Sequence, residues 1–193
     1  MPSSKHEIER KYLIRMPDVR SLEQTDGVRV LRITQTYLEG GTGMTRRVRR
    51  IEESGKVSYI LTEKMPFDPI TRIETETPLS EEEYNRLVAF ADPACAPLSK
   101  VRYAIPMGQY CYEIDIYPTS EKIAVLEVEL SDPTDRPPLP SFCALVADVS
   151  EDRRFSNHHL SRLLKKDPKS DPFSLLLSQN NAIFDQKSIH IIK

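Results

Sequence analysis

The sequence predicts an α+β fold in which most of the chain forms antiparallel β-structure and a minority of helices packs outside it. Up to about residue 130 the chain consists of short extended segments separated by turn residues. Within these segments, ionisable residues recur at every second position, which places them on one face of a strand. The length of 193 residues suits one domain with a terminal appendage.

The first part of the chain is expected to supply five strands. They are predicted at 6–14, 28–38, 44–51, 57–64 and 70–77. Gly40, Gly41 and Gly43 lie between the second and third strands and predict a hairpin turn, because glycine adopts positive φ at little cost. Gly55 predicts the next turn.

The clearest helix is predicted to begin after Ser80. Glu83 stands three residues on and completes a capping box, and Pro93 lies beyond the end of the helix. Three further strands are expected at 100–105, 110–117 and 123–130.

The last third of the chain is expected to be irregular and then helical. Four prolines within 131–140 predict a loop, since proline cannot continue a ladder. Helices are predicted at 156–166 and at 172–184, where Asp171 and Pro172 offer a cap and a first-turn proline.

The charged residues carry the functional information. Each set on one strand shares a face, with members about 6.5–7 Å apart, and most sets carry one sign of charge. The sets are Glu7, Glu9 and Lys11; Arg47 and Arg49; Lys64; Arg72, Glu74 and Glu76; Lys100 and Arg102; Glu113 and Asp115; and Glu127 and Glu129. In 112–117 and 123–130 the opposite face is apolar.

A face of this kind is either solvated or turned into an enclosed space. Two carboxylates about 7 Å apart repel by roughly 0.6 kcal/mol in water, but by about 2.4 kcal/mol at an effective dielectric constant near 20. A solvated face usually mixes neutral polar residues with both signs of charge, whereas here the signs are segregated. We therefore expect a closed barrel with an ionic interior that holds a multiply charged anion and a hard cation.

Composition excludes several classes of protein. With 27 basic and 29 acidic residues the formal net charge is −2, and aromatic residues make up only 7%, so neither a nucleic acid nor a membrane is an expected partner. No signal peptide or long apolar run is found, which predicts a cytoplasmic protein. Cys95, Cys111 and Cys143 lack CxxC spacing, and His158 and His159 are adjacent and cannot share a helix face, so no zinc site is expected.

A family resemblance rests on the order of these charged motifs. The stretch HEIERKYLI at 6–14 resembles the ExExK signature that opens the CYTH domain, the triphosphate tunnel metalloenzyme family. Further motifs resemble that family in order, namely TQTYL at 34–38, RVR at 47–49, LTEK at 61–64, RIETE at 72–76, KVRY at 100–103, YEID at 112–115, EVE at 127–129 and DRRFSN at 152–157. Phe155 stands where the family usually has tyrosine, so the hydroxyl of that position is absent here.

The resemblance implies a fold and a set of site residues. The fold would be an eight-stranded antiparallel β-barrel forming a tunnel over residues 1–165, while residues 166–193 would form a C-terminal helix and tail that cap the barrel or pack outside it. The implied phosphate-binding residues are Lys11, Arg47, Arg49, Lys64, Arg72, Lys100 and Arg102. The implied ligands of Mg²⁺ or Mn²⁺ are Glu7, Glu9, Glu127 and Glu129. Glu74, Glu76, Glu113 and Asp115 would orient water, a second metal or the basic side chains, and the candidate catalytic residues are Glu7, Glu9, Lys11, Glu76 and Glu129.

The activity implied first is metal-dependent hydrolysis of a small-molecule triphosphate, with inorganic tripolyphosphate giving pyrophosphate and phosphate. Class IV adenylyl cyclase and thiamine triphosphatase are the enzymatic alternatives, and a polyphosphate-binding or nucleotide-binding module is the non-enzymatic one. The carboxylates disfavour a module that binds only an anion, because acidic side chains beside an anion support its binding only where a metal ion is also bound. The oligomeric state is left open.

Overall fold

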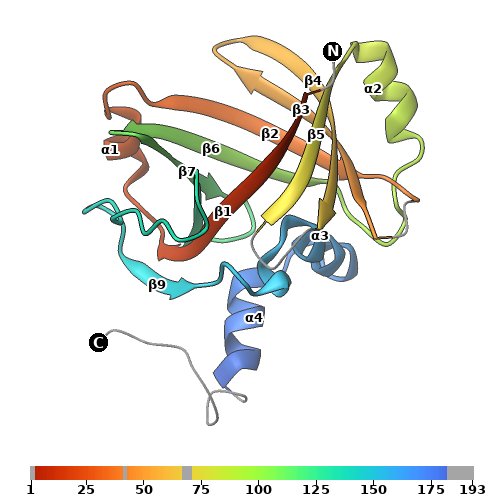
Figure 1. Ribbon diagram of the computed structural model, residues 1–193. Helices are drawn as coiled ribbons and strands as arrows, with labels where there is room; N and C mark the ends of the chain where they lie inside the picture. The colour runs from red at the N-terminus through yellow and green to blue at the C-terminus, as the bar shows by residue number, and fades with distance from the viewer. Residues whose placement is uncertain (1–2, 41–42, 67–70, 182–193) are drawn as a thin grey trace.

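The computed structural model describes residues 3–40, 43–66 and 71–181, and within them it shows a nine-stranded antiparallel sheet with few helices (Figure 1). The strands are β1 (Ser3–Arg15), β2 (Arg29–Tyr37), β3 (Thr45–Glu53), β4 (Lys56–Pro66), β5 (Thr71–Leu79), β6 (Leu98–Met107), β7 (Tyr110–Ile116), β8 (Ile123–Glu129) and β9 (Leu145–Asp148). The helices are α1 (Val19–Glu23), α2 (Glu81–Val88), α3 (Asn157–Lys166), α4 (Pro172–Asn181) and the 3₁₀ turn η1 (Arg153–Phe155). The predicted α+β class is confirmed.

The strand order of the sheet brings β1 into contact with strands from both ends of the order. It runs β5-β4-β3-β2-β6-β7-β8-β1-β9, and β1 pairs in addition with β5. Residues 3–8 of β1 pair with β5, whereas residues 9–15 pair with β8. The sheet has one strand more than the eight expected, because β9 pairs with residues 12–14 of β1. The sheet curves strongly, so that β1 pairs with β8, its neighbour in the strand order, and also with β5 from the opposite end of that order (Figure 1).

Local signals in the sequence account for several elements. The Ser80 side chain accepts a hydrogen bond from the Glu83 N–H at 3.2 Å, and the Glu83 carboxylate accepts one from the Ser80 N–H at 2.7 Å, so the predicted capping box is confirmed. Gly40 and Gly43 have φ of 88° and 79° in the turn between β2 and β3. Gly41 lies outside the described residues.

An apolar core covers the outer face of part of the sheet. Residues at alternate positions of β1, β6, β7 and β8 gather there with Leu22 of α1, and the members include Tyr12, Ile14, Tyr103, Ile105, Tyr112, Ile114, Leu126 and Val128. These are the apolar positions that alternate with the charged ones, so the prediction of one apolar and one ionic face is confirmed for these strands.

A second core lies at one end of the ionic face. On three strands the ionic face becomes apolar towards this end. The change comes at the residue two positions from the last charged one, namely at Leu13 of β1, Leu98 of β6 and Val125 of β8. These side chains belong to one cluster with Leu160 of α3 and Phe173 of α4. Helices from the end of the chain therefore pack on that end of the sheet (Figure 1). No helix in the described part of the chain is long and apolar enough to span a membrane.

Candidate active site

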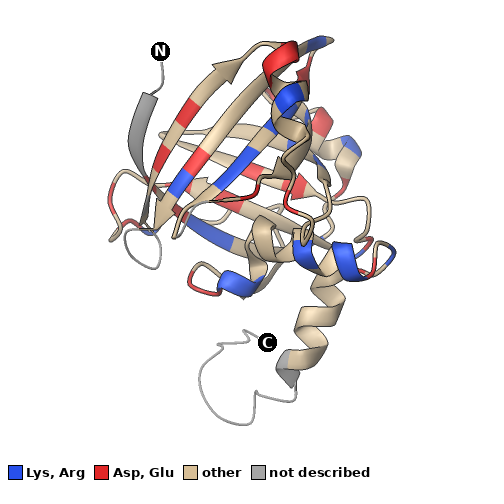
Figure 2. Cartoon of the chain, turned by 90° about the vertical axis from the view of Figure 1, so that its right-hand side faces the viewer, with Lys and Arg blue, Asp and Glu red and all other residues tan. Residues whose placement is uncertain are grey.

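The ionic face of the sheet encloses a cavity of about 710 Å³. Charged side chains from seven strands line it, as the alternating stripes of basic and acidic residues in Figure 2 suggest. The predicted site residues in its lining are Glu7, Glu9, Lys11, Arg47, Arg49, Lys64, Glu74, Glu76, Lys100, Arg102, Glu113, Glu127 and Glu129. Two predicted residues are not part of this lining. Asp115 is fully buried behind it, and the side chain of Arg72 on β5 lies outside the described residues.

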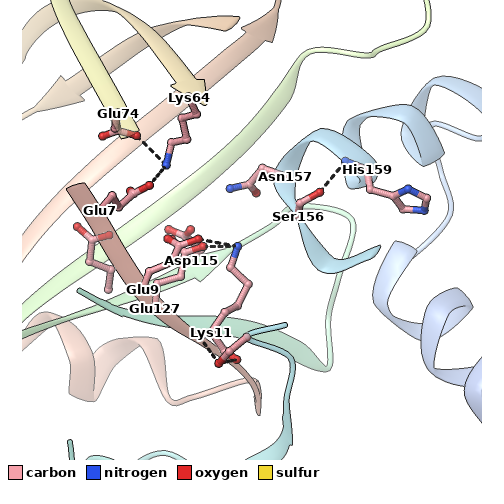
Figure 3. A network of polar contacts seen from close by, with 12 residues as sticks. Glu7, Glu9, Lys11, Lys64, Glu74, Asp115, Glu127, Ser156, Asn157 and His159 are labelled. Atoms are coloured by element: carbon pink, nitrogen blue, oxygen red, sulfur yellow. Dashed lines mark hydrogen bonds and ion pairs between the residues drawn. The ribbon is translucent and has the colours of Figure 1, made fainter. Parts of the chain in front are cut away.

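One ionic cluster joins β4 to β1 and β5. The Lys64 ammonium lies 2.5 Å from a Glu7 carboxylate oxygen and 2.7 Å from Glu74 (Figure 3). The register explains the meeting, because Lys64 and Glu74 are paired residues of neighbouring strands. A cation is thus held between two carboxylates on the cavity wall.

A second cluster lies deeper, on β1, β6, β7 and β8. Glu127 accepts from the Lys11 ammonium at 2.8 Å (Figure 3). It also accepts from the Arg102 guanidinium at 2.5 Å. Arg102 also donates to Asp115 at 2.6 and 2.7 Å and contacts Glu113, while Lys100 contacts Asp115. The completely buried carboxylate therefore holds two of the predicted phosphate-binding side chains in place.

The charges of the second cluster are strongly perturbed. Burial, assisted by the neighbouring Arg102 cation, lowers the pKa of Lys100 to about 8. Burial acts to raise the pKa of Glu127, but Lys11 and Arg102 outweigh it and hold that pKa well below its ordinary value. Burial raises the pKa of Glu113, even though Arg102 acts in the opposite direction. A cluster with perturbed pKa values in a cavity is typical of functional sites.

Two arginines on β3 stand apart from these clusters. The Nε–H groups of Arg47 and Arg49 are buried without a hydrogen-bond partner among the described residues. Arg49 contacts Glu76 through another nitrogen, and a nitrogen of Arg47 lies 3.5 Å from the Gln35 side-chain oxygen. Burial and the adjacent Arg47 lower the pKa of Arg49 to about 10. Buried donors without acceptors, next to a second positive charge, are what a bound anion would satisfy.

The four glutamates predicted as metal ligands lie on one wall, on β1 and β8. Glu9 and Glu129 are directly paired residues of these antiparallel strands, so their side chains leave the same face close together. Basic side chains lie beside this set of glutamates, since Lys64 contacts Glu7, and Lys11 contacts Glu127 and lies 3.8 Å from Glu9. A set of carboxylate oxygens fits a hard cation such as Mg²⁺ or Mn²⁺.

The sequence did not predict the part of the cavity wall that α3 contributes. Ser156 caps α3 by accepting from the His159 N–H at 3.2 Å, and Asn157 lies at the start of that helix, on the side of the ion pairs (Figure 3). This wall consists of Arg153, Ser156, Asn157, His158, His159 and Arg162. The motif DRRFSN identified this segment in the sequence but did not predict that it lines the cavity. The apolar spacing of a helix does not indicate which part of a sheet the helix will pack against.

The fold and the site together define a class of protein in which a curved antiparallel sheet encloses a cavity. Buried acidic and basic side chains line this cavity and compensate one another's charges. No family model matches the sequence, and no curated protein matches it. Among solved structures, the PH1819 protein from Pyrococcus horikoshii OT3 is 18% identical, with a TM-score of 0.52, over 65% of this chain and 79% of that chain. The inorganic triphosphatase NE1496 is 22% identical, with a TM-score of 0.49, over 81% of this chain and 94% of that chain. HpAC1 from Hippeastrum, a candidate adenylyl cyclase described as having a dominant triphosphatase activity, is 10% identical, with a TM-score of 0.41, over 65% of this chain and 81% of that chain.

The likeness to PH1819 establishes a shared fold. The shared fold agrees with the antiparallel β-structure that the order of the charged motifs implied.

Proposed function

We propose that this chain is a metal-dependent hydrolase that cleaves a triphosphate inside the cavity, with inorganic tripolyphosphate as its substrate and pyrophosphate and phosphate as products. The observation that carries the proposal is the pair of buried Nε–H donors of Arg47 and Arg49, which have no acceptor in the described part of the chain and lie in a cavity that also holds carboxylates. Cationic donors alone would suit any anion. Carboxylates in the same cavity are useful only if a cation accompanies that anion.

The cavity has the form of a tunnel in this proposal. The pairing of β1 with both β5 and β8 supports a circuit of eight strands around the ionic face, with β9 outside the circuit. The circuit and α3 belong to a domain of residues 1–165. Residues 166–193 form an appendage, whose α4 extends the apolar packing at one end through Phe173 and Leu176.

The basic side chains bind and align the phosphate chain. Arg47 and Arg49 supply Nε–H donors that have no acceptor among the described residues, whereas Lys11 and Lys64 exchange carboxylate partners for phosphate oxygens. Lys100 and Arg102 bind the phosphate chain while they stay paired with the buried Asp115. Exchange of one buried ionic partner for another avoids leaving an uncompensated charge in the cavity. Phosphoryl transfer relies mainly on such positioning and charge neutralisation.

The metal site of the proposal consists of Glu7, Glu9, Glu127 and Glu129, which bind the ion when phosphate takes over the basic side chains beside them. When bound, Mg²⁺ or Mn²⁺ neutralises charge on the reacting phosphate and lowers the pKa of bound water. Glu76 lies against Arg49, beside the expected position of the phosphate chain, and is our candidate for orienting the attacking water.

A substrate panel tests the proposal. The purified protein is incubated with Mg²⁺ or Mn²⁺ and with tripolyphosphate, ATP or thiamine triphosphate, and the products are identified. We expect phosphate and pyrophosphate to be released fastest from tripolyphosphate. Cyclic AMP and pyrophosphate from ATP would establish a cyclase, faster cleavage of thiamine triphosphate would establish that substrate, and binding without turnover would establish a binding module. Each of these three results would overturn the proposal.

A further inference from the structure

A second group of metal-binding side chains lies outside the carboxylate set. Asp92 and Cys95 stand in the turn that follows α2, and His158 stands in the first turn of α3. A carboxylate oxygen, the thiol sulfur and an imidazole nitrogen all lie within 4.8 Å of one another. Oxygen, sulfur and nitrogen donors from two distant segments thus converge on one point.

The surrounding hydrogen bonds hold the turn and the helix in this relation. The Asp92 carboxylate accepts from the Ala94 N–H at 2.8 Å, and the Cys95 N–H donates to the Asp92 carbonyl oxygen at 3.0 Å. The Ala96 N–H donates to the Ser161 carbonyl oxygen at 3.0 Å, and the Ser161 hydroxyl donates back to the Ala96 carbonyl oxygen at 2.8 Å. The turn is therefore tied to α3 by two reciprocal bonds that do not use the three donor atoms.

The imidazole of His158 is also positioned by packing. Its ring lies against the Tyr37 ring, with 4.8 Å between the ring centroids. His158 and Asp92 line a small cavity of about 370 Å³, which leaves room for a water molecule beside these two donors. Cys95 is buried, with 7% of its surface exposed.

The distances suit one tetrahedral ion. With Zn–S near 2.3 Å and Zn–N or Zn–O near 2.1 Å, two ligands at the tetrahedral angle lie roughly 3.4–3.6 Å apart. The Cys95 sulfur is 3.7 Å from an Asp92 carboxylate oxygen. This separation is close to that of two ligands of one ion without any movement of the backbone, and an imidazole nitrogen of His158 lies within 4.8 Å of the sulfur and of an Asp92 carboxylate oxygen.

We propose that Asp92, Cys95 and His158 bind a divalent transition metal of the zinc class, with water as a fourth ligand. One thiol proton is released to solvent as the sulfur–metal bond forms, so no oxidant or reductant is required. A thiolate and an imidazole favour this borderline-soft class over Mg²⁺, which prefers oxygen ligands. The bound ion would lock the turn after α2 to the first turn of α3, whose residues line the large cavity.

The sequence alone predicted no zinc site, because it offers no CxxC pair and no second cysteine near Cys95. The fold brings the three donors together from distant parts of the chain, so their spacing in the sequence forms no recognisable metal-binding motif. The inference does not depend on the proposed hydrolase activity, because these three side chains lie outside the carboxylate set on β1 and β8.

Cobalt absorption tests the site directly. Reduced, chelator-treated full-length protein is titrated with Co²⁺, and we expect a near-ultraviolet thiolate-to-cobalt charge-transfer band that saturates at one equivalent and is bleached by Zn²⁺. Co²⁺ bound by the carboxylates of the large cavity cannot produce this band, because no thiolate contacts it there. Absence of the band at one equivalent would overturn the proposal.

Substitutions identify the ligands. Cys95→Ser should abolish the charge-transfer band, and Asp92→Asn should weaken Co²⁺ binding by more than the roughly 10–100-fold that loss of an outer hydrogen bond costs. Cys111→Ser, the same change at an exposed cysteine, should leave the titration unchanged. Circular dichroism of each variant without metal checks that it is folded. A charge-transfer band that persists in folded Cys95→Ser, or that disappears in Cys111→Ser, would refute the assignment. If Cys95→Ser fails to fold, Cys95→Ala is used in its place.

Discussion

Arg47 and Arg49 are the residues whose surroundings most require a ligand. Both carry buried Nε–H donors without acceptors among the described residues, and burial together with the Arg47 charge lowers the pKa of Arg49. Burial acts to lower the pKa of Arg47 as well, but Tyr37, Glu74 and Glu7 outweigh it and raise that pKa. The protein thus holds Arg49 as a cation whose surroundings disfavour its charge until an anion arrives. Such preorganisation places charge at the reacting group without a later rearrangement.

The first prediction concerns Arg49→Ala. Loss of a charged donor to the reacting phosphate chain should lower kcat/KM for tripolyphosphate by about 10²–10³-fold. The urea midpoint should change little, because the substitution removes the repulsion from Arg47 and leaves Glu76 with a side chain 31% exposed to water. Steady-state kinetics and urea unfolding measure the two effects.

Arg50→Ala is the matched control, since Arg50 follows directly on β3 and points to the opposite face, where it pairs with Glu52. It should keep nearly full activity. Equal losses in the two variants would show that the face of β3 towards the cavity has no special role.

The second prediction concerns pH. Lys100 has a pKa of about 8, so its positive charge is present below pH 8 and is lost as the pH rises above it. Because kcat/KM reports the ionisations of the free enzyme, kcat/KM for tripolyphosphate should fall as the pH rises through about 8. In Lys100→Arg, whose guanidinium stays protonated, the fall should move to higher pH. Any ionisation of the substrate is common to both enzymes, and superimposable pH profiles would contradict the assignment.

Site residues were predictable wherever they follow the strand period. The pairs at spacing two on β1, β3, β5, β6 and β8 lie in the cavity wall, because alternation fixes the face of a strand whatever its neighbours are. Asp115 also shares that face, but its depth could not be foreseen, and it acts as a buried partner of Lys100 and Arg102. His158 could not be predicted, because its neighbours Tyr37 and Asp92 are remote in the sequence.

At the scale of elements, α2 allows a test of a local signal. The third prediction is that Ser80→Ala lowers the free energy of unfolding by about 1 kcal/mol, because the Glu83 N–H loses its acceptor. Activity should stay unchanged, since no residue of α2 lines the large cavity. Urea unfolding measures the effect, with Glu82→Ala in the same turn as the control, for which we expect a change within about 0.5 kcal/mol. An equal cost for both variants would mean that the capping box contributes no stability of its own.

Long elements were predicted better than short ones. The strands from β1 to β8 follow from sustained alternation, and α3 and α4 follow from their apolar spacing and caps. The five residues of α1 bury only Leu22, and the four residues of β9 follow a proline-rich loop, so neither segment shows a period that could be recognised. β9 exists because β1 offers it a free edge beyond β5, which is a property of the assembled sheet.

At the scale of the whole molecule, the cavity couples ligand binding to stability. The fourth prediction is that tripolyphosphate with Mg²⁺, at about 100 times its Kd, stabilises the protein by about 2.7 kcal/mol. For a chain of this size that gain corresponds to roughly 5–10 °C in Tm. Differential scanning calorimetry with and without the ligands measures it.

Arg49→Ala should show a much smaller shift at the same concentrations, while Arg50→Ala should behave as the unaltered protein does. An unchanged Tm in the unaltered protein, with both ligands present, would contradict binding inside the sheet.

The double pairing of β1 has a consequence for biosynthesis. Its partners lie far along the chain, in β5 at residues 71–76 and in β8 at residues 123–129, so β1 leaves the ribosome before both of them and completes its hydrogen bonds only after β8 has been made. Contacts so distant in sequence slow folding and leave strand edges exposed in the meantime. A nascent chain that stalls before β8 therefore presents β1 with an unpaired edge, and we expect truncated products of this gene to aggregate where the full-length chain does not.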